Sequence, residues 1–560
     1  MTHDSNIWLW LASFFPLVLL LFLMVMRRWG AAEAGVVAWL VTSVIALAVF
    51  RLPVEAIGLE SVRGVFEAVT IVYIILSAIL IYEVANEANA FEPFQRGMTR
   101  IFSHPLLQIM AIGWVFDGFL QGVTGFGVPV AVCAPLLVGL GVRPAYAVVI
   151  ALIGQAWNNT FGTLGVAWLG LKQVTQLSPA GDATTALRTG ILIAVLTVAG
   201  GLMISWLYGR LRGLWEGLPA VLFISLAQGG ITVALAQWNG TLNGFIASLV
   251  ALFVIAGLAR LPMYRRPSRV EHSPAFHTSP TAGAPQREPV AATADGSAGA
   301  TERAPRQVST LATPAVAAPH MSLNTAFIPY YTLLVVTGLV LLVGPLNAVL
   351  SKPTISLTFP AVSTDLGFTA ESSTQDFVFL THAGTLLLVT AAISYVVYRR
   401  MGHLRRGAWR RIVSNTIEKS IGPTIAVIAL VGMAAVMQGS GQATVLATEV
   451  AAWTGGIYLI LAPFVGVFGT FITGSNLSSN LLFGTFQQAT AHAAGLSTTG
   501  ALSAQSAGGA AGSMISPSKI LLGTTTAGIA GQEGRVLRRL LPFTLGVTVI
   551  IGAITMFVFD

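Results

Sequence analysis

The chain has 560 residues, of which 54% are apolar and only 9% are charged, and its mean hydropathy is +0.77. A soluble domain usually carries about a quarter charged residues, so the composition excludes an ordinary soluble protein. The net charge of +8 comes from short basic clusters between apolar runs, which are typical of cytoplasmic loops and do not indicate a nucleic-acid partner. The single cysteine, Cys133, excludes a disulfide within the chain.

Runs of about 20 apolar residues recur along the chain, and each can cross the roughly 30 Å of hydrocarbon in a bilayer. In the first half we predict spans near 7–26, 33–50 and 65–85, a group of elements at 106–172, and spans near 188–208, 217–236 and 241–259. The first run follows Asp4 and precedes Arg27 and Arg28. We therefore expect a retained first helix with its N-terminus outside the cell and its other end in the cytoplasm.

The apolar character is interrupted between residues 261 and 322, where Pro, Ala, Ser, Thr and charged residues predominate. Such a composition buries too little apolar surface to offset the entropy of ordering, so we predict a disordered linker. Its arginine-rich start places it in the cytoplasm. The linker separates an N-terminal membrane half, 1–260, from a C-terminal membrane half, 323–560.

After the linker we predict spans near 327–349 and 376–398, a region rich in Gly, Ser and Thr at about 421–530, and a last span near 537–558. The lengths and composition of these segments predict an all-α polytopic membrane protein. About twelve to fourteen elements are expected to cross the membrane or to re-enter it.

The two halves are predicted to be related. Residues 116–122 (FDGFLQG) and 468–474 (FGTFITG) share a pattern of Phe, two residues, Phe, an aliphatic residue, one residue and Gly. Each is followed by a turn rich in Gly or Ser, a helix, and a second polar break, at 155–165 and 506–519. Interrupted apolar segments at matching positions are typical of transporters built from inverted repeats. We therefore predict two inverted halves with broken helices at the midplane.

The polar breaks are the candidate binding site. A helix broken inside hydrocarbon is tolerated only where the break faces protein or a water-filled cavity. There, a half-helix N-terminus offers N–H donors and about half a positive charge to an anion. The predicted substrate-binding residues are Gln121, Gly122, Thr124, Gly125, Gly127, Asn158, Thr473, Gly474, Ser475, Asn476, Ser478, Ser479, Asn480 and Ser516.

Small residues also permit close helix packing, so not every polar or glycine-rich stretch is a site. We assign AGGAAG at 507–512 to packing, and TGSNLSSN at 473–480 to binding, because two amides beside hydroxyls exceed what packing needs. Whether Lys519 lies in the site or at the membrane interface stays open. Asp117, directly before the first break, is the candidate proton carrier, with an interfacial carboxylate as the alternative.

These same segments resemble the lactate permease family of bacterial secondary transporters. The matching stretches are GFLQGVTGFGVPVAVCAPLLVGLGVRPAYA at 118–147, FGTFITGSNLSSNLLFGTFQ at 468–487, and MISPSK from residue 514 with the later GIAGQEGRVLRR. The resemblance covers nearly both membrane halves, with the linker as an insertion. It implies uptake of lactate, and in some members glycolate, in symport with protons across the bacterial inner membrane.

The chain departs from the family pattern at three places. Family members typically have a glutamate where this chain has Gln121, Gly-Ser-Asp-Thr-Ser-Ser-Asn where it has Asn476 followed by Leu477, and a lysine where it has Ser513. Two acids are thus amides here and one base is a hydroxyl. The proton would then ride on Asp117 or on the substrate itself. Sodium coupling is an alternative, because unwound carbonyls and amides suit Na⁺.

The sequence therefore predicts a secondary transporter that imports a small monocarboxylate, lactate or glycolate, by proton symport. The alternatives are a Na⁺-coupled or altered-specificity organic anion transporter and an anion channel. An enzyme is not expected, because the sequence has no metal-ligand helix, no P-loop and no nucleophile–base pair; no cofactor is expected either. Transport could proceed by movement of one site-bearing assembly or by rocking of the halves, and the oligomeric state stays open.

Overall fold

The computed structural model describes residues 7–27, 29–90, 93, 101–125, 127–238, 240–265, 268, 270, 273–276 and 321–560. Within them, nine helical stretches are long and apolar enough to cross a membrane. The 58-residue stretch Pro179–Ala236 is folded back on itself at Gly209 and Arg210, so that Gly190 lies against Val233. The predicted class, a polytopic helical membrane protein, is confirmed.

The N-terminal half begins with three long helices, α1 (Ile7–Val25), α2 (Ala31–Ala48) and α3 (Val54–Glu87). Next come α5 (Pro105–Met110), η1 (Ala111–Phe116), α6 (Asp117–Val123), α7 (Val128–Gly139), α8 (Pro144–Ala156), η2 (Trp157–Asn159) and α9 (Gly162–Thr175). The half ends with α10 (Pro179–Ser225), η3 (Leu226–Gly230), α11 (Ile231–Ala236), α12 (Gly240–Leu258) and the short α13 (Pro262–Arg265).

The C-terminal half starts with α14 (Leu323–Ala326), α15 (Ile328–Leu342) and α16 (Gly344–Leu350). Four short strands follow, β1 (Thr354–Phe359), β2 (Val362–Ser363), β3 (Thr369–Ala370) and β4 (Ser373–Val378). The remaining helices are α17 (Ala383–Arg400), α18 (Ala408–Gly439), α19 (Gln442–Thr454), η4 (Gly455–Ile457), α20 (Tyr458–Thr473), α21 (Asn476–Ala493), α22 (Thr498–Gly512), α23 (Pro517–Thr526) and α24 (Glu533–Phe559).

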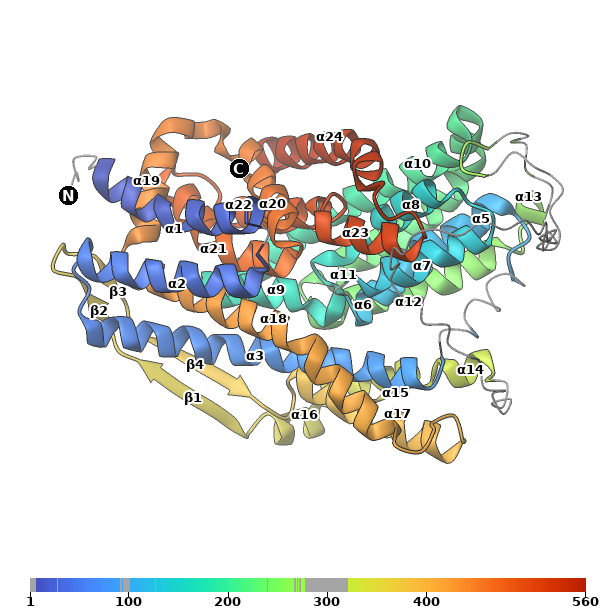
Figure 1. Cartoon of the computed structure of the whole chain (residues 1–560), viewed down its shortest axis with the longest axis horizontal. Helices are drawn as coiled ribbons and strands as arrows, with labels where there is room; N and C mark the ends of the chain where they lie inside the picture. The colour runs from blue at the N-terminus through green and yellow to red at the C-terminus, as the bar shows by residue number, and fades with distance from the viewer. Residues whose placement is uncertain are drawn as a thin grey trace, which may run out of the picture.

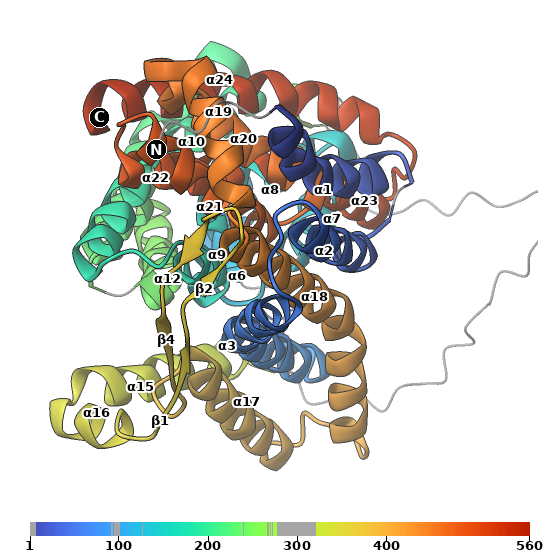
Figure 2. The ribbon, with the colours of Figure 1, turned by 90° about the vertical axis from the view of Figure 1, so that its left-hand side faces the viewer.

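The strands are an element that the all-α prediction lacks. β1 pairs antiparallel with β4, and β2 with β3, so the segment between α16 and α17 forms a β-hairpin that lies beside α3 (Figures 1 and 2). Phe359 of the β-hairpin contacts Phe66 of α3. The alternation in TISLTF is a strand pattern. The span expected at 376–398 therefore begins only at Ala383.

Each half contains a helical hairpin whose tip lies inside the protein. In the first half, α6 and α7 turn at 124–127, and a Cβ added at Gly113 would lie 3.0 Å from Leu137. In the second, α20 and α21 turn at 474–475, where a Cβ added at Gly469 would lie 2.3 Å from the Ser479 hydroxyl. Re-entrant arms such as the 12-residue α7 are too short to cross a bilayer. The predicted twelve to fourteen elements include such re-entrant arms as well as full-length spans.

Each hairpin is followed by an interrupted helix, α8 and α9 in the first half and α22 and α23 in the second. The same order in both halves is what related halves require, and their inversion stays a prediction. The break expected at 506–519 begins only at Ser513, because 507–512 belong to α22. A Cβ added at Gly508 would lie 2.1 Å from the Pro463 carbonyl oxygen, so the assignment of AGGAAG to packing is confirmed.

The helices form two groups that cut across the division into halves (Figures 1 and 2). Helices α2, α3, α17 and α18 form what we call the long-helix group, in which Gly64 of α3 packs against Gly432 of α18. The hairpins and interrupted helices of both halves form the hairpin group, in which α9 packs on α21 and α7 on α23. The two halves are thus interleaved.

Most of the predicted linker, 261–322, lies outside the described residues. Its described beginning packs on the N-terminal half. Tyr264 of α13 is buried, and the Arg143 N–H donates to the carbonyl of Ala275 at 2.7 Å. Phe276 forms a bridge with Val142 in the turn between α7 and α8. The predicted disorder therefore does not extend to residues 273–276, which pack on the folded protein.

Candidate functional site

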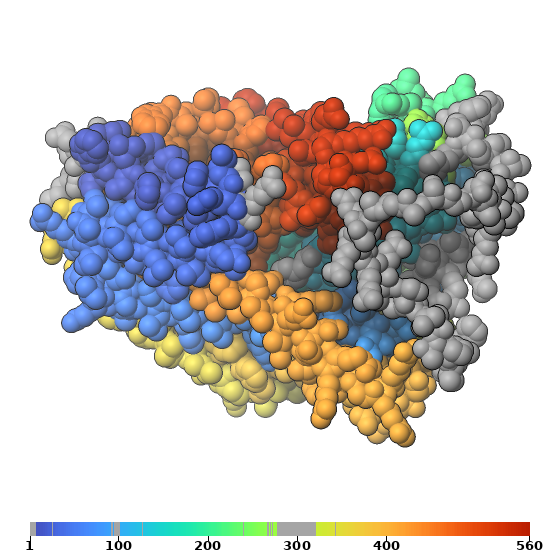
Figure 3. Space-filling model, viewed as in Figure 1, coloured from blue at the N-terminus to red at the C-terminus, as the bar shows by residue number. Residues whose placement is uncertain are grey.

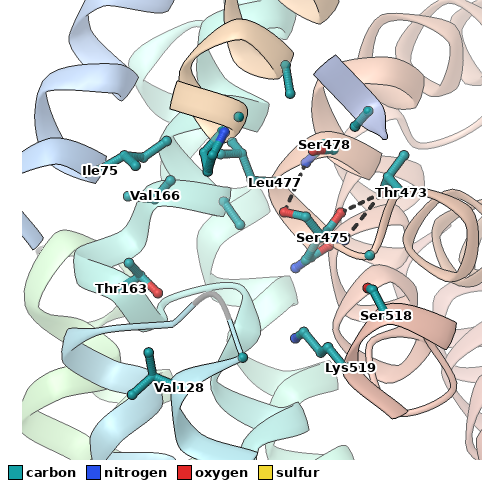
Figure 4. A pocket seen from close by; sticks show the side chains of 18 of the residues that line it. Ile75, Val128, Thr163, Val166, Thr473, Ser475, Leu477, Ser478, Ser518 and Lys519 are labelled. Atoms are coloured by element: carbon teal, nitrogen blue, oxygen red, sulfur yellow. Dashed lines mark hydrogen bonds between the residues drawn. The ribbon is translucent and has the colours of Figure 1, made fainter. Parts of the chain in front are cut away.

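A cavity of about 710 Å³ lies between the two groups of helices. The surface is hollowed where α2, α18 and the C-terminal helices approach one another (Figure 3). The long-helix group contributes a mainly apolar wall, including Ile75, Ile79, Ala426 and Val427, with Glu33, Tyr82 and Lys419. The polar wall comes from the hairpin group and includes Gln121, Thr124, Asn159, Thr163, Thr473, Ser475, Asn476, Ser478, Ser518 and Lys519 (Figure 4).

Three helix N-termini converge on this cavity. Helices α7, α21 and α23 begin at its edge, and Val128, Ser478 and Ser518 in their first turns line it. The first N–H groups of a helix lack partners within the helix, and each terminus carries about half a positive charge. The polar wall is therefore suited to an anion.

The tips of both helical hairpins contact α23, and each tip contains a glycine that permits this contact. Gly127 and Gly474 have φ values of +86° and +77°, a left-handed conformation that glycine adopts without steric cost. A Cβ added at Gly127 would lie 2.6 Å from Leu522, and one added at Gly474 would lie 2.5 Å from Ser518. Glycine thus permits both the turn and the close approach, which brings α23 beside both tips.

The start of α9 is strained. Thr163, Leu164 and Gly165 have φ values of 51°, 54° and 73°, and for the first two this costs about 1–2 kcal/mol each. Thr163 lines the cavity, and its hydroxyl donates to the Gln121 carbonyl at 3.4 Å. Strain of this kind persists only where the surroundings hold it in place, and it gathers at ligand sites. The predicted break at 155–165 is present, and it forms part of the cavity wall.

Lys519, whose position the sequence leaves open, lies in the cavity wall. It is 7% exposed, and its Nζ donates to Oδ1 of Asn159 at 2.9 Å. Nε2 of Gln121 donates to the same oxygen at 3.4 Å, and Nδ2 of Asn159 donates to the Ser513 hydroxyl at 2.9 Å. An ammonium group thus stands among neutral amides and a hydroxyl. Gln121 and Ser513 are two of the positions at which the chain departs from the family pattern.

Eight predicted site residues line the cavity, namely Gln121, Thr124, Gly127, Thr473, Gly474, Ser475, Asn476 and Ser478. In the described part of the chain, the others, Gly122, Gly125, Asn158, Ser479, Asn480 and Ser516, do not line it. Gly125 lies within the first tip, against Thr163. The Ser516 hydroxyl lies 3.0 Å from that of Ser518, so these two residues adjoin the cavity.

Asn158 and Gly122 hold α6 and α12 together. Nδ2 of Asn158 donates to the carbonyls of Gly118 and Gly244 and to the Ser248 hydroxyl, at 2.9, 3.1 and 3.0 Å. Gly122 lies inside α6, where a Cβ would be 3.3 Å from the carbonyl oxygen of Gly244. The first break is therefore narrower than the sequence predicts, because Gly122 belongs to α6. In the later break at 155–165, the amide that faces the cavity is that of Asn159, not that of Asn158.

Ser479 and Asn480 likewise join helices. The Ser479 hydroxyl donates to the Gly466 carbonyl at 3.0 Å, across the second hairpin. Nδ2 of Asn480 donates to the Ala167 carbonyl and to the Ser506 hydroxyl, each at 3.0 Å. The Ser479 hydroxyl and the NH₂ group of Asn480 therefore donate to protein partners, as burial of such donors requires.

Asp117 is fully buried in α6, so it is not the water-exposed interfacial carboxylate of the alternative interpretation. It lies beside the Cys133 thiol of α7 and within electrostatic reach of Lys519. Among the described residues, neither of its carboxylate oxygens has a nitrogen or oxygen hydrogen-bond partner.

Buried hydrogen bonds join the two halves beside the cavity. Nδ2 of Asn476 donates to the Thr160 hydroxyl at 3.1 Å, and the Thr160 hydroxyl donates to the Ser506 carbonyl at 3.1 Å. Together with the bonds of Asn159 and Asn480, they form a seam between the halves that we call the polar seam. Separating the halves here would leave several buried polar groups without partners.

Re-entrant hairpins whose tips and helix N-termini surround a polar cavity are the architecture of a membrane transporter. The chain matches the family model described as L-lactate permease over residues 10–559. It belongs to the L-lactate permease family, as its motifs predict, and it is a permease rather than an enzyme.

Individual relatives are similar along nearly their whole length. The chain is 27% identical to the L-lactate permease of Bacillus subtilis (strain 168), covering 97% of this chain and 95% of that protein. It is 28% identical to the glycolate permease GlcA of Escherichia coli (strain K12), covering 98% and 95%. Among solved structures, the Alcanivorax borkumensis YdaH transporter matches with a TM-score of 0.43 and 15% identity, covering 86% and 84%.

Proposed function

We propose that this permease imports lactate or glycolate across the bacterial inner membrane in symport with a proton. Its relatives are named for these two small monocarboxylates. The observation that carries the proposal is the convergence of Lys519 and three helix N-termini on one cavity wall. An ammonium group and the positive ends of helix dipoles are features that stabilise a buried carboxylate.

Within the cavity, we assign the carboxylate to Lys519 and to the start of α21, where Ser475 and Ser478 add hydroxyl groups. The amides of Gln121 and Asn159 adjoin Lys519 and can bind a 2-hydroxyl group. The apolar wall of α3 and α18 suits the carbon side of the molecule.

Proton coupling follows from the charge of the substrate. A monoanion that enters a negative-inside cell works against about 2.3 kcal/mol per 100 mV of membrane potential. One co-transported proton cancels this charge, and the pH gradient can then drive accumulation. We assign the proton to Asp117, which is buried close to the carboxylate site.

We further propose that the N-terminus lies outside and that the linker is cytoplasmic. Glu33 and Lys419 then lie on the side of Arg27 and of the basic segment 399–411, so the cavity opens to the cytoplasm in this structure. Because the polar seam joins the halves, we favour movement of the hairpin group against the long-helix group over rocking of the halves.

The test is uptake of labelled L-lactate and glycolate into proteoliposomes with an imposed proton gradient, an imposed sodium gradient, or neither. Uptake that follows the proton gradient and disappears with a protonophore is the expected result. Uptake that follows only the sodium gradient would show that the coupling ion is sodium and not the proton. Saturable counterflow distinguishes a transporter from an anion channel. A folded protein that takes up neither substrate would contradict the proposal.

Deleting residues 281–315 is expected to leave lactate uptake within about twofold of the unmodified protein, because a long insertion between two folded parts contributes little to stability. The deletion starts after Ala275 and Phe276, which contact the turn between α7 and α8. A companion deletion that also removes 268–276 should lower the melting temperature. Loss of uptake by the shorter deletion, at normal expression, would show that the segment has a role in transport.

A further inference from the structure

We infer that Lys519 is shared between Asp117 and the substrate, so that binding of the anion is linked to uptake of a proton by Asp117. This inference rests on the proposed function and gives its coupling a physical basis. It depends on the charges around the cavity, on the surroundings of Asp117, and on the hydrogen bond that Lys519 makes.

The polar wall holds few charges. Among the described residues that line the cavity, Lys519 is the charged side chain of the hairpin group, and the buried Asp117 of the same group lies within electrostatic reach of it. On the opposite wall, Lys419 is already paired with Glu83, and Glu33 is a further anion. With Asp117 ionised, Lys519 and Asp117 balance each other, and the polar wall is neutral before substrate binds. A bound carboxylate without a proton would leave a net negative charge in a region of low dielectric constant.

Asp117 has little besides Lys519 to stabilise its charge. Its carboxylate is 0% exposed, and its oxygens have no nitrogen or oxygen donor among the described residues. The Cys133 thiol beside it is only a weak donor. The carboxylate therefore depends on the positive charge of Lys519, because an isolated carboxylate in an apolar interior is strongly disfavoured.

The hydrogen bond of Lys519 leaves it able to serve a second anion. Its Nζ donates to Oδ1 of Asn159. Nδ2 of Asn159 donates to the carbonyls of Gln155 and Ala156 and to the Ser513 hydroxyl, so the orientation of this amide is set by its neighbours. An ammonium group has three N–H donors, and the neutral Asn159 uses one of them. The other two are available to a carboxylate in the cavity.

The sequence of events follows from these charges. When a substrate carboxylate binds Lys519, it balances the positive charge of the ammonium group, which then stabilises the Asp117 carboxylate less. A proton from water then forms an O–H bond on the Asp117 carboxylate, and the loaded site is neutral again. After the substrate is released to the cytoplasm, the Lys519 charge again stabilises the Asp117 carboxylate. The O–H bond then breaks, and the proton returns to water. One proton thus accompanies one monoanion.

Two measurements on the full-length protein test the inference. The first is calorimetric titration of the purified protein with lactate in buffers of different ionisation enthalpy, which reports protons taken up per lactate bound. The unmodified protein should take up about one proton, and Asp117→Asn should take up none. Asp117→Glu, which keeps the carboxyl group, should still take up a proton and thereby shows that the carboxyl group, not the fold, is responsible.

The second measurement is the ratio of gradient-driven accumulation to lactate exchange in proteoliposomes. One pH unit supports about tenfold accumulation by a one-to-one symporter, since a tenfold ratio corresponds to about 1.4 kcal/mol. The accumulation ratio, which is the lactate concentration inside divided by that outside, should fall to about one in Asp117→Asn. As a control, Asp182→Asn removes a carboxylate that is paired with Lys172 away from the cavity, and should accumulate lactate normally.

Accumulation by Asp117→Asn equal to that of the unmodified protein, or lactate binding without proton uptake in the unmodified protein, would overturn the inference while leaving lactate transport intact. Failure of the unmodified protein to transport lactate or glycolate would instead overturn the proposed function, and the inference with it.

Discussion

Replacing Lys519 with methionine is expected to weaken lactate binding by roughly 30-fold to several thousand-fold. Removing one partner of a buried, hydrogen-bonded charge pair costs about 2–5 kcal/mol, and each 1.4 kcal/mol is a factor of ten. Methionine keeps much of the length and volume of the side chain in this 7% exposed position. The loss should appear as a higher KM for uptake and as a higher Kd in calorimetric titration.

The matched control is Lys419→Met. Lys419 also lines the cavity, but its side chain is 50% exposed and is already paired with Glu83. Ion pairs with an exposed ammonium group contribute about 0–1 kcal/mol, and Asn415 also donates to the buried Glu83, so this change should alter the KM by less than about fivefold. If Lys519→Met folds and binds lactate as tightly as Lys419→Met does, the carboxylate does not bind at Lys519.

Replacing Gly154 with alanine is expected to lower the free energy of unfolding by about 3 kcal/mol or more. The added Cβ would lie 1.8 Å from the carbonyl oxygen of Gly113 and 2.8 Å from the Cα of Trp114. Both are backbone atoms, so η1 and α8 would have to separate, and overpacking of this kind costs about 1–3 kcal/mol or occasionally more. Thermal unfolding of the purified protein in detergent measures the effect.

The same change elsewhere provides the control. Gly257 of α12 has nothing within 4 Å of an added Cβ, and alanine is about 1 kcal/mol more favourable than glycine inside a helix. Gly257→Ala should therefore be neutral or stabilising. Gly508→Ala, whose Cβ would meet the Pro463 carbonyl oxygen in the second half, should behave like Gly154→Ala. A normal melting temperature for Gly154→Ala would show that the hairpin does not pack on α8 as described.

The features that the sequence predicts well are those that act locally. Long apolar runs define spans wherever they occur, and the polar breaks stand out because hydrocarbon excludes hydroxyls and amides. Gly474 adopts the left-handed conformation of a turn, and glycine can do so without help from distant residues. The assignment of 473–480 to the cavity needs little beyond such local rules, although Ser479 and Asn480 turn away from it.

The features that the sequence misses depend on distant partners. The side chain of Asn158 turns to Ser248, and that of Asn159 turns to Ser513, yet the two adjacent amides are chemically identical. No periodicity distinguishes them, because the helix is interrupted at this point. Lys519 is similar, since its burial results from contact of α23 with both hairpin tips. The β-hairpin does not follow from long apolar runs, because its strands are short and largely exposed.

The polar seam also constrains how the protein is made. Thr160 bonds to Ser506, which is 346 positions later in the chain. At about 5–20 residues per second, a ribosome needs roughly 20–70 s to synthesise the intervening segment. During this time Thr160, Asn159 and the Ala167 carbonyl of the inserted N-terminal half lack the partners that the C-terminal half supplies. Its first hairpin must remain in an incomplete state, screened by water, by the insertion machinery or by temporary contacts, until the second half enters the bilayer. Neither half expressed alone should reach its native packing, whereas the two halves produced together should assemble around these bonds.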